Sequence, residues 1–166
     1  MRYDPCKITI AVGGSRKAKQ WKIKNISWPD ILDKLRVTTR TRESAAEYAK
    51  LSKSRQDEIK DVGGFVGGYI KNGRRIAGNV VKRQLVTLDA DFADSSFMTI
   101  LDLVLGDVCY AVYSTHKHTP EKPRLRVVIP LTRTVQPDAY QAIARRIADD
   151  IGMDLFDDTT YEAERL

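Results

Sequence analysis

The sequence has few cysteines and no long hydrophobic run, and both absences narrow the class of protein. Its two cysteines, Cys6 and Cys109, lie far apart and in apolar stretches. This pattern favours a reducing compartment and excludes a cysteine-rich zinc site. No apolar run approaches the ~20 residues that a membrane-spanning helix needs, and the N-terminus has no signal-peptide core. We therefore expect a cytoplasmic protein with no membrane partner.

The sequence also lacks an internal repeat, a low-complexity tract and a linker rich in proline or serine. Its 166 residues fit one globular domain, because domains typically contain about 100–200 residues. Hydrophobic residues make up 42% of the chain and charged residues 30%, which is typical of a folded protein rather than a disordered or fibrous one.

The net charge of +6 is distributed unevenly along the chain. Residues 1–60 contain 15 basic and 7 acidic side chains, residues 61–135 contain 10 and 7, and residues 136–166 contain 3 and 8. A basic front half suits a polyanion such as nucleic acid or nucleotide phosphate. Solvated lysines and arginines that serve only solubility produce the same pattern, so the charge alone leaves both interpretations open.

Hydrophobic periodicity and turn signals predict an α+β fold. From residue 84 onwards we expect a strand, a helix, two strands and a second helix: 84–88, 94–105, 108–114, 125–131 and 137–151. Asp94 or Ser95 would cap the first helix. This βαββα order is one strand short of a split βαβ unit, and the sequence stops where that strand would begin.

The N-terminal part is predicted to add a strand and two helices to the same domain: 6–12, 28–35 and 43–52. We assign 1–60 to a basic α/β part and 61–166 to a core that is truncated at its C-terminal end. The glycine-rich segment 63–68 lacks the Gly-Lys-Ser/Thr of a phosphate-binding P-loop. It is interpreted as allowing close backbone packing, or as leaving room for a ligand strand.

Asp89 and Asp91 are the first candidate functional residues. They follow the apolar run 85–88, and residues i and i+2 of a strand share one face, so both carboxylates are expected at the exposed end of a central strand. Two such close like charges repel unless a cation lies between them, and oxygen ligands suit Mg²⁺ or Mn²⁺. A helix-capping loop that includes Asp94 and Ser95 is the alternative.

A second candidate segment is the loop after the strand 108–114. Ser114 and His116 carry side chains that can donate hydrogen bonds to phosphate, and both histidines of the chain, His116 and His118, fall in this loop. Four basic residues lie within the same hairpin: Lys117, Lys122, Arg124 and Arg126. Arginine can bind phosphate with two parallel hydrogen bonds. A polar, basic surface hairpin without a ligand is the alternative.

The third candidate is the acidic pair Asp157 and Asp158, which follows Phe156. A carboxylate placed here after a helix could reach the same sheet edge as Asp89, and Asp157 is preferred because it directly follows the apolar residue. An acidic surface loop or capping turn is the alternative.

Three segments in this order resemble motifs of the archaeo-eukaryotic primase superfamily: Asp89-Ala90-Asp91, Ser114-Thr115-His116 and Phe156-Asp157. Their surroundings resemble primase–polymerases of phages and other mobile elements, in the segments 60–65, 85–91, 113–116, 123–131 and 156–160 with Arg165. The resemblance covers residues 60–166 and is loose before them. It implies an RNA-recognition-motif-like sheet and template-directed nucleotidyl transfer on single-stranded DNA.

The resemblance also implies roles for individual residues. Asp89, Asp91 and His116 would be catalytic, and Asp89, Asp91 and Asp157 would hold two divalent ions, Mg²⁺ or Mn²⁺. Ser114 and His116 would bind the incoming nucleoside triphosphate. Charge and position add three further candidate nucleotide ligands: Lys117, Arg124 and Arg126. A replicative helicase, fused or in trans, is an expected partner, and a bacterial host cytoplasm is the expected location if a phage encodes the protein.

Two other functions remain open. A rolling-circle replication initiator would use His116 and His118 as metal ligands and Tyr140 or Tyr161 as nucleophile, although Lys117 stands where that motif normally has an apolar residue. A non-catalytic nucleic-acid-binding module would use the basic face alone. Its DNA binding would depend steeply on salt and not on Asp89 or Asp91.

Overall fold

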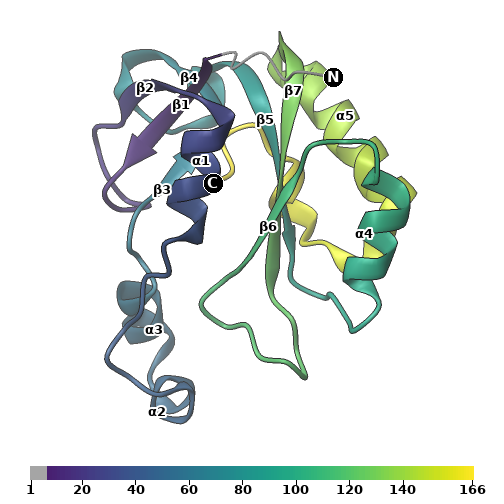
Figure 1. Cartoon of the computed structure of the whole chain (residues 1–166). Helices are drawn as coiled ribbons and strands as arrows, with labels where there is room; N and C mark the ends of the chain where they lie inside the picture. Colours follow the sequence, from purple (N-terminus) through teal and green to yellow (C-terminus); the bar gives the residue numbers. More distant parts are fainter. Residues whose placement is uncertain (1–6) are drawn as a thin grey trace.

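Two antiparallel sheets and five α-helices make up the described part of the protein (Figure 1). The computed structural model describes residues 7–166. In chain order the elements are β1 (Ile8–Gly13), β2 (Lys22–Ile26), α1 (Trp28–Arg36), α2 (Ala45–Lys50), α3 (Lys53–Ile59), β3 (Gly64–Val66), β4 (Gly68–Ile70), β5 (Val80–Ala90), α4 (Phe97–Leu105), β6 (Ala111–Ser114), β7 (Leu125–Val135) and α5 (Pro137–Ile151). The predicted α+β class and the βαββα order β5-α4-β6-β7-α5 are confirmed.

The larger sheet has the strand order β4-β5-β7-β6, with every neighbouring pair antiparallel. One face packs against α4 and α5, which lie side by side on the right of Figure 1. The buried residues of this layer include Val86, Leu88, Val127, Ile129, Phe97, Leu101, Tyr140 and Ala144. The other face packs against β1 and α1, where Leu85 and Val128 meet Ile10, Trp28 and Ile31. The sheet is therefore the middle layer of the protein.

Two predicted boundaries around α4 are wrong, and local hydrogen bonds explain both. The helix begins at Phe97 after Ser96, whose side chain makes no cap bond; Asp94 instead caps the turn before it, where its carboxylate accepts from the backbone N and hydroxyl of Ser96 at 2.8 and 2.6 Å. The next strand begins at Ala111 rather than residue 108, because Val108 still donates to the Leu105 carbonyl in the turn that ends the helix. Cys109 in this turn is exposed and unpaired, whereas Cys6 lies outside the described residues.

The edge of β5 that faces away from β7 is covered by two segments. β4 pairs with its first part, where a Cβ on Gly68 would lie 2.0 Å from the Lys82 carbonyl oxygen, so the predicted close backbone packing is confirmed. The C-terminal residues run along its second part: Asp157 N donates to Asp89 O at 2.9 Å. Together they occupy the place expected for a closing strand. That the chain is truncated stays a prediction.

Arg83 fixes this C-terminal segment from inside the protein. Its side chain is fully buried, and its guanidinium donates to the carbonyls of Leu85 and Ala163 and to the Tyr140 hydroxyl. All of these acceptors are neutral, so burial lowers the pKa of Arg83. Removing the acceptors would leave a buried unpaired charge, which is costly.

The N-terminal part forms the smaller sheet, β2-β1-β3, and the helices α1 to α3. The predicted helix 28–35 is confirmed as α1, and Ser27 caps it, because the Ser27 hydroxyl accepts from Asp30 N. The predicted helix 43–52 is observed as the shorter α2, capped by Ser44, and a second short helix, α3, capped by Ser52, follows it; both extend below the sheets in Figure 1. Within residues 7–166, no helix has the length and apolar character needed to cross a membrane.

Candidate active site at the end of β5

Asp89 and Asp91 lie where β5 leaves the sheet, on the face that also packs against β1 and α1. The register pairs Asp89 with Arg126 of β7, and Arg126 in turn with Tyr113 of β6. These three side chains therefore form one row across the sheet, since directly paired residues share a face. Leu85 and Val128 lie on the same face of the sheet, so the row lies next to the inter-layer core.

Asp89 is held by two arginines. Its carboxylate oxygens lie 2.5 Å from Arg126 Nε and 3.3 Å from Arg165 Nε, and the side chain is only 8% exposed. Burial disfavours the charge on Arg126, but the nearby oxygens of Tyr113 and Asp89 outweigh it and raise the pKa of Arg126. A carboxylate this buried needs such partners, because an unpaired charge away from water is strongly unfavourable.

Asp157 joins the same group through the C-terminal segment. Its Oδ1 atom lies 3.5 Å from Arg165 Nη2, so Arg165 connects the carboxylates of Asp89 and Asp157. Hydrogen bonds from the hydroxyl and backbone N of Thr159 lower the pKa of Asp157, and the charges of Arg165 and Arg124 act in the same direction. Asp158 begins a short 3-10 turn and is exposed. Of the two candidate acids, the structure brings Asp157 to the site.

Asp91 faces Arg124, with 2.7 Å between Oδ2 and Nη1. Both side chains are about one-third exposed, so this pair lies at the mouth of the site. We use the name Asp–Arg cluster for the six residues Asp89, Asp91, Asp157, Arg124, Arg126 and Arg165.

The residue types of the Asp–Arg cluster suit a divalent cation, but arginines now contact all three carboxylates. Among residues 7–166, no group of three His, Cys, Asp or Glu side chains is arranged to hold a metal ion. Carboxylates are the preferred ligands of Mg²⁺ and Mn²⁺. Cation binding would therefore require the guanidinium groups to move away from the oxygens that they contact.

Of the hairpin candidates, Arg124 and Arg126 join this cluster, but Ser114 and His116 do not contact it. Ser114 is in register with Leu125, which faces the helix layer, so Ser114 belongs to the opposite row from Asp89. His116 packs against Tyr48 of α2, with ring centroids 4.3 Å apart, and its Nε2 atom lies 3.2 Å from the Thr41 hydroxyl.

Lys117 is close to the basic residues of α3 and the segment after it. Burial lowers the pKa of Lys117, and the charges of Lys53 and Lys60 lower it further. His118 is turned toward its own hairpin, where its Nδ1 atom accepts from Arg124 N at 3.2 Å. The hairpin thus joins the N-terminal helices to the sheet.

Sequence reasoning missed Arg165 and Tyr113 as site residues. Tyr113 receives a hydrogen bond from Arg126 Nη1 at 3.3 Å, and Arg165 reaches two carboxylates. Strand alternation could have suggested Tyr113, because it lies two residues from the buried-face residue Ala111. Nothing in the sequence alone pairs Arg165 with Asp89, since 76 positions separate them.

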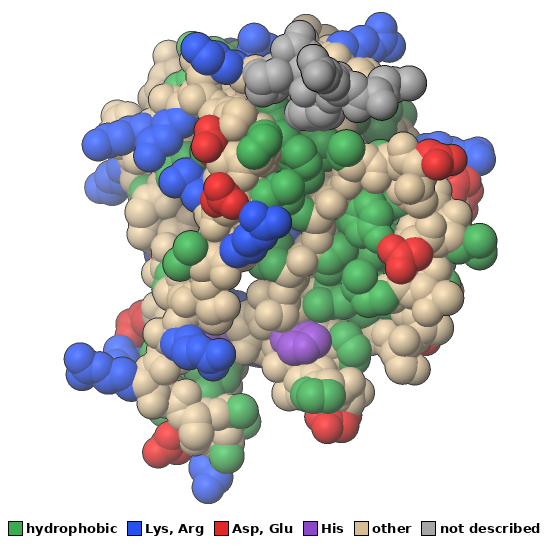
Figure 2. All heavy atoms as spheres, viewed as in Figure 1, with side chains coloured by type: hydrophobic (Ala, Val, Ile, Leu, Met, Phe, Trp, Pro, Cys, Tyr) green, Lys and Arg blue, Asp and Glu red, His purple; other side chains and the backbone are tan. Residues whose placement is uncertain are grey.

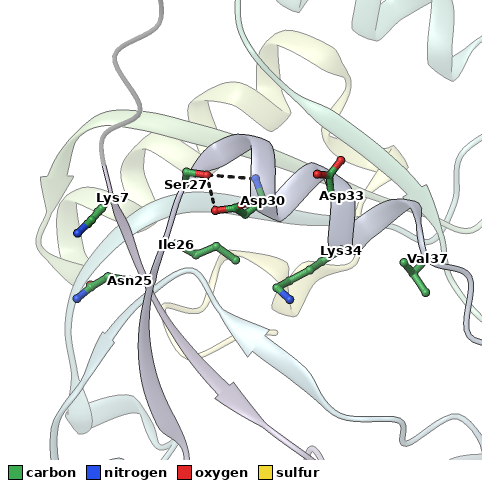
Figure 3. A pocket seen from close by; sticks show the side chains of 8 residues that line it. All are labelled: Lys7, Asn25, Ile26, Ser27, Asp30, Asp33, Lys34 and Val37. Carbon is green, nitrogen blue, oxygen red and sulfur yellow. Dashed lines mark hydrogen bonds between the residues drawn. The ribbon is translucent and has the colours of Figure 1, made fainter.

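A separate pocket lies elsewhere, on β2 and α1 (Figure 3). It has a volume of about 650 Å³, and its lining mixes Lys7 and Lys34 with Asp30 and Asp33. Figure 3 shows Asp30 turned toward Ser27, whose hydroxyl lies 2.6 Å from its carboxylate. No predicted site residue lines this pocket, so we place the candidate site at the Asp–Arg cluster, where the charged groups converge.

The fold and the site define a mixed α+β domain with a charged cluster at the end of a central strand. The family model of the VapE N-terminal domain matches residues 1–166, so the chain belongs to this family. The domain is associated with replication in phages and other mobile elements. A search of curated proteins and a search of solved structures found no match to the chain.

Proposed function

We propose that this domain is the catalytic part of a primase or primase–polymerase, which joins nucleotides from nucleoside triphosphates on a single-stranded DNA template. The observation that carries the proposal is the convergence of Asp89, Asp91 and Asp157 beside three arginines at one strand end. Membership of a replication-associated family supports it. A replicative helicase, fused or in trans, is the proposed partner.

The three carboxylates would hold Mg²⁺ or Mn²⁺. Such ions lower the pKa of the attacking hydroxyl and stabilise the leaving pyrophosphate. In transfers of this kind the protein contributes mainly position and charge neutralisation. Asp89 is suited to a fixed position because it is buried within the sheet, whereas Asp91 and Asp157 are about one-third exposed and can accept a ligand from solvent.

The arginines of the Asp–Arg cluster would bind the triphosphate. Arg124, Arg126 and Arg165 now neutralise the carboxylates, and guanidinium groups bind phosphate oxygens with the same paired geometry. A move from carboxylate to phosphate would free the acids for cations. The cluster is neutral, with three carboxylates and three guanidiniums. A nucleoside triphosphate with two divalent cations is about neutral as well. We therefore expect the triphosphate and the cations to bind to the cluster together.

Ser114, His116 and Lys117 are proposed as further contacts of the nucleotide. The contacts of His116 with Tyr48 and Thr41 hold the hairpin loop against the N-terminal helices, so the loop has a defined position. Lys117 adds positive charge on the same side. Closure of the loop toward the Asp–Arg cluster, with release of the contacts of His116 with Tyr48 and Thr41, would bring these groups to the phosphates.

A nucleotide-incorporation assay tests the proposal. We expect the protein to extend or synthesise a strand on single-stranded DNA with Mn²⁺ and nucleoside triphosphates. Asp91→Asn removes a partly exposed carboxylate and should reduce incorporation at least about a hundredfold, whereas the control Asp158→Asn changes an exposed neighbour of the cluster and should leave it unchanged. Full activity of Asp91→Asn, or no incorporation together with no Mn²⁺-dependent nucleotide binding, would contradict the proposal.

The two alternative functions make different demands on the structure. A tyrosine nucleophile must be accessible, but Tyr140 is fully buried and bonded to Arg83, and Tyr161 is 3% exposed. These observations weigh against a rolling-circle initiator.

A non-catalytic nucleic-acid-binding module agrees with the arginine-bound state of the carboxylates, and it is the second candidate. Its DNA binding would not change in Asp91→Asn.

A further inference from the structure

A second concentration of positive charge lies beside the turn that follows β1. Two segments distant in sequence, 16–19 and 74–76, line a pocket of about 220 Å³: Arg16, Lys17, Ala18, Lys19, Arg74, Arg75 and Ile76. Five of these seven residues are basic and none is acidic. We call this the basic pocket. Figure 2 shows that lysine and arginine side chains also gather on the left of the molecule, over the β1–β2 hairpin.

The two segments of the basic pocket are fixed to each other by a buried tryptophan. Trp21 is 3% exposed, its Nε1 atom donates to the Ala18 carbonyl at 2.9 Å, and its backbone N donates to the Gly73 carbonyl at 2.8 Å. The guanidinium of Arg75 lies 5.4 Å from the centre of the Trp21 ring. Gly73 has a φ of +60°, which a side chain would strain. The basic groups are thus held on a rigid base.

The charge of the basic pocket is not balanced by carboxylates. Of its five basic residues, only Arg16 makes an ion pair with a described residue, at 3.1 Å from Asp57. Arg75 donates to two backbone carbonyls, those of Arg16 at 2.9 Å and Glu164 at 3.2 Å. Carbonyls accept from both of its Nη atoms and leave its positive charge in place, while its buried Nε atom has no hydrogen-bond partner among the described residues.

The cations of this region disfavour one another. Burial lowers the pKa of Arg75; the carboxylates of Glu164 and Asp61 act against this, and the charges of Arg165 and Arg16 act with it. A bound anion would relieve this repulsion. Lys17, Lys19 and Arg74 are exposed at the rim, together with the apolar side chain of Ile76, which is 53% exposed.

We infer that the basic pocket binds the phosphodiester backbone of a nucleic-acid strand. Exposed cations from two segments can contact successive phosphates, and Ile76 offers apolar surface to a sugar or base. The pocket also adjoins the Asp–Arg cluster through the C-terminal segment, because Arg75 contacts the Glu164 carbonyl and the next residue, Arg165, contacts Asp89. One strand can therefore reach both regions. The inference needs neither a metal ion nor catalysis.

Fluorescence anisotropy with a labelled single-stranded oligo-dT, in EDTA, tests this inference. The variant K17Q/K19Q/R74Q removes three rim cations, and the control K24Q/K34Q/R133Q removes three exposed cations from β2, α1 and β7 that do not line the pocket. Each phosphate contact to a single strand contributes about 0.7 to the slope of log affinity against log salt. The pocket variant should lower the slope by about 2 and the affinity roughly a hundredfold at 0.1 M salt.

The control variant should change the affinity far less, and this contrast is expected in EDTA even if nucleotide incorporation is never observed. Equal losses in the pocket and control variants would overturn the inference, because the binding would then be general electrostatic attraction. A parallel titration with ATP and with pyrophosphate separates the two sources of phosphate. Loss of ATP or pyrophosphate binding, with oligonucleotide binding intact, would overturn the inference in favour of a free polyphosphate site.

Discussion

The Asp–Arg cluster and the basic pocket both concentrate arginine, but only the cluster balances each cation with a carboxylate. In the cluster, Asp89 is buried, and the charges of Arg126 and Arg165 offset the charge of its carboxylate inside the protein. In the pocket, Lys17, Lys19 and Arg74 remain in water and need no such partner. The difference separates charges that the fold depends on from charges that are available to a ligand.

The largest effect should come from breaking the balance of the cluster. Asp89→Ala leaves Arg126 largely buried without its carboxylate, so we expect a loss of about 3–5 kcal/mol in the free energy of unfolding, measured by urea denaturation. The double variant Asp89→Asn/Arg126→Met removes both charges and should lose clearly less. Equal losses in the two variants would show that the ion pair does not determine the stability of this region.

A much smaller effect is expected when charge is removed from the basic pocket. Lys17→Gln/Lys19→Gln changes two exposed side chains without a described ion-pair partner, so the free energy of unfolding should stay within about 0.5 kcal/mol of the parent value. The same urea experiment measures it. A loss comparable with that of Asp89→Ala would mean that the pocket cations are structural, and the contrast between the two regions would be wrong.

Asp57 sharpens the comparison because it pairs with Arg16, the one pocket cation that has an acidic partner within residues 7–166. Hydrogen bonds from Lys60 and Arg16 hold the pKa of Asp57 at about 2, below its ordinary value of 3.8. Its contribution to stability is therefore complete above the unfolded-state pKa and is lost as the pH falls toward 2. The stability difference between the parent protein and Asp57→Asn should be constant above pH 5 and shrink below pH 4. A difference independent of pH would contradict this.

The sequence predicted the secondary-structure elements better than the contacts between them. Periodic apolar residues located α5, and strand alternation put Asp89 at the end of a buried strand, because both signals are local. The contacts of Arg165 with Asp89 and of the 16–19 turn with 74–76 join distant segments, so no local pattern contains them. Ser114 illustrates the same limit: its face depends on register with Leu125, which only the paired strands define.

Arg83 has a consequence for how the chain folds. Its acceptors come from β5 itself, from Tyr140 on α5 and from Ala163. The last of these is synthesised 80 residues after Arg83. During synthesis the Nη1 atom has no protein acceptor until Ala163 has emerged, whereas Nε and Nη2 already find acceptors on β5 and α5. Burial of Nη1 without an acceptor is unfavourable, so Arg83 is completely enclosed only after the segment around Ala163 has docked. Such long sequence separations between contacting residues are typical of slow-folding topologies.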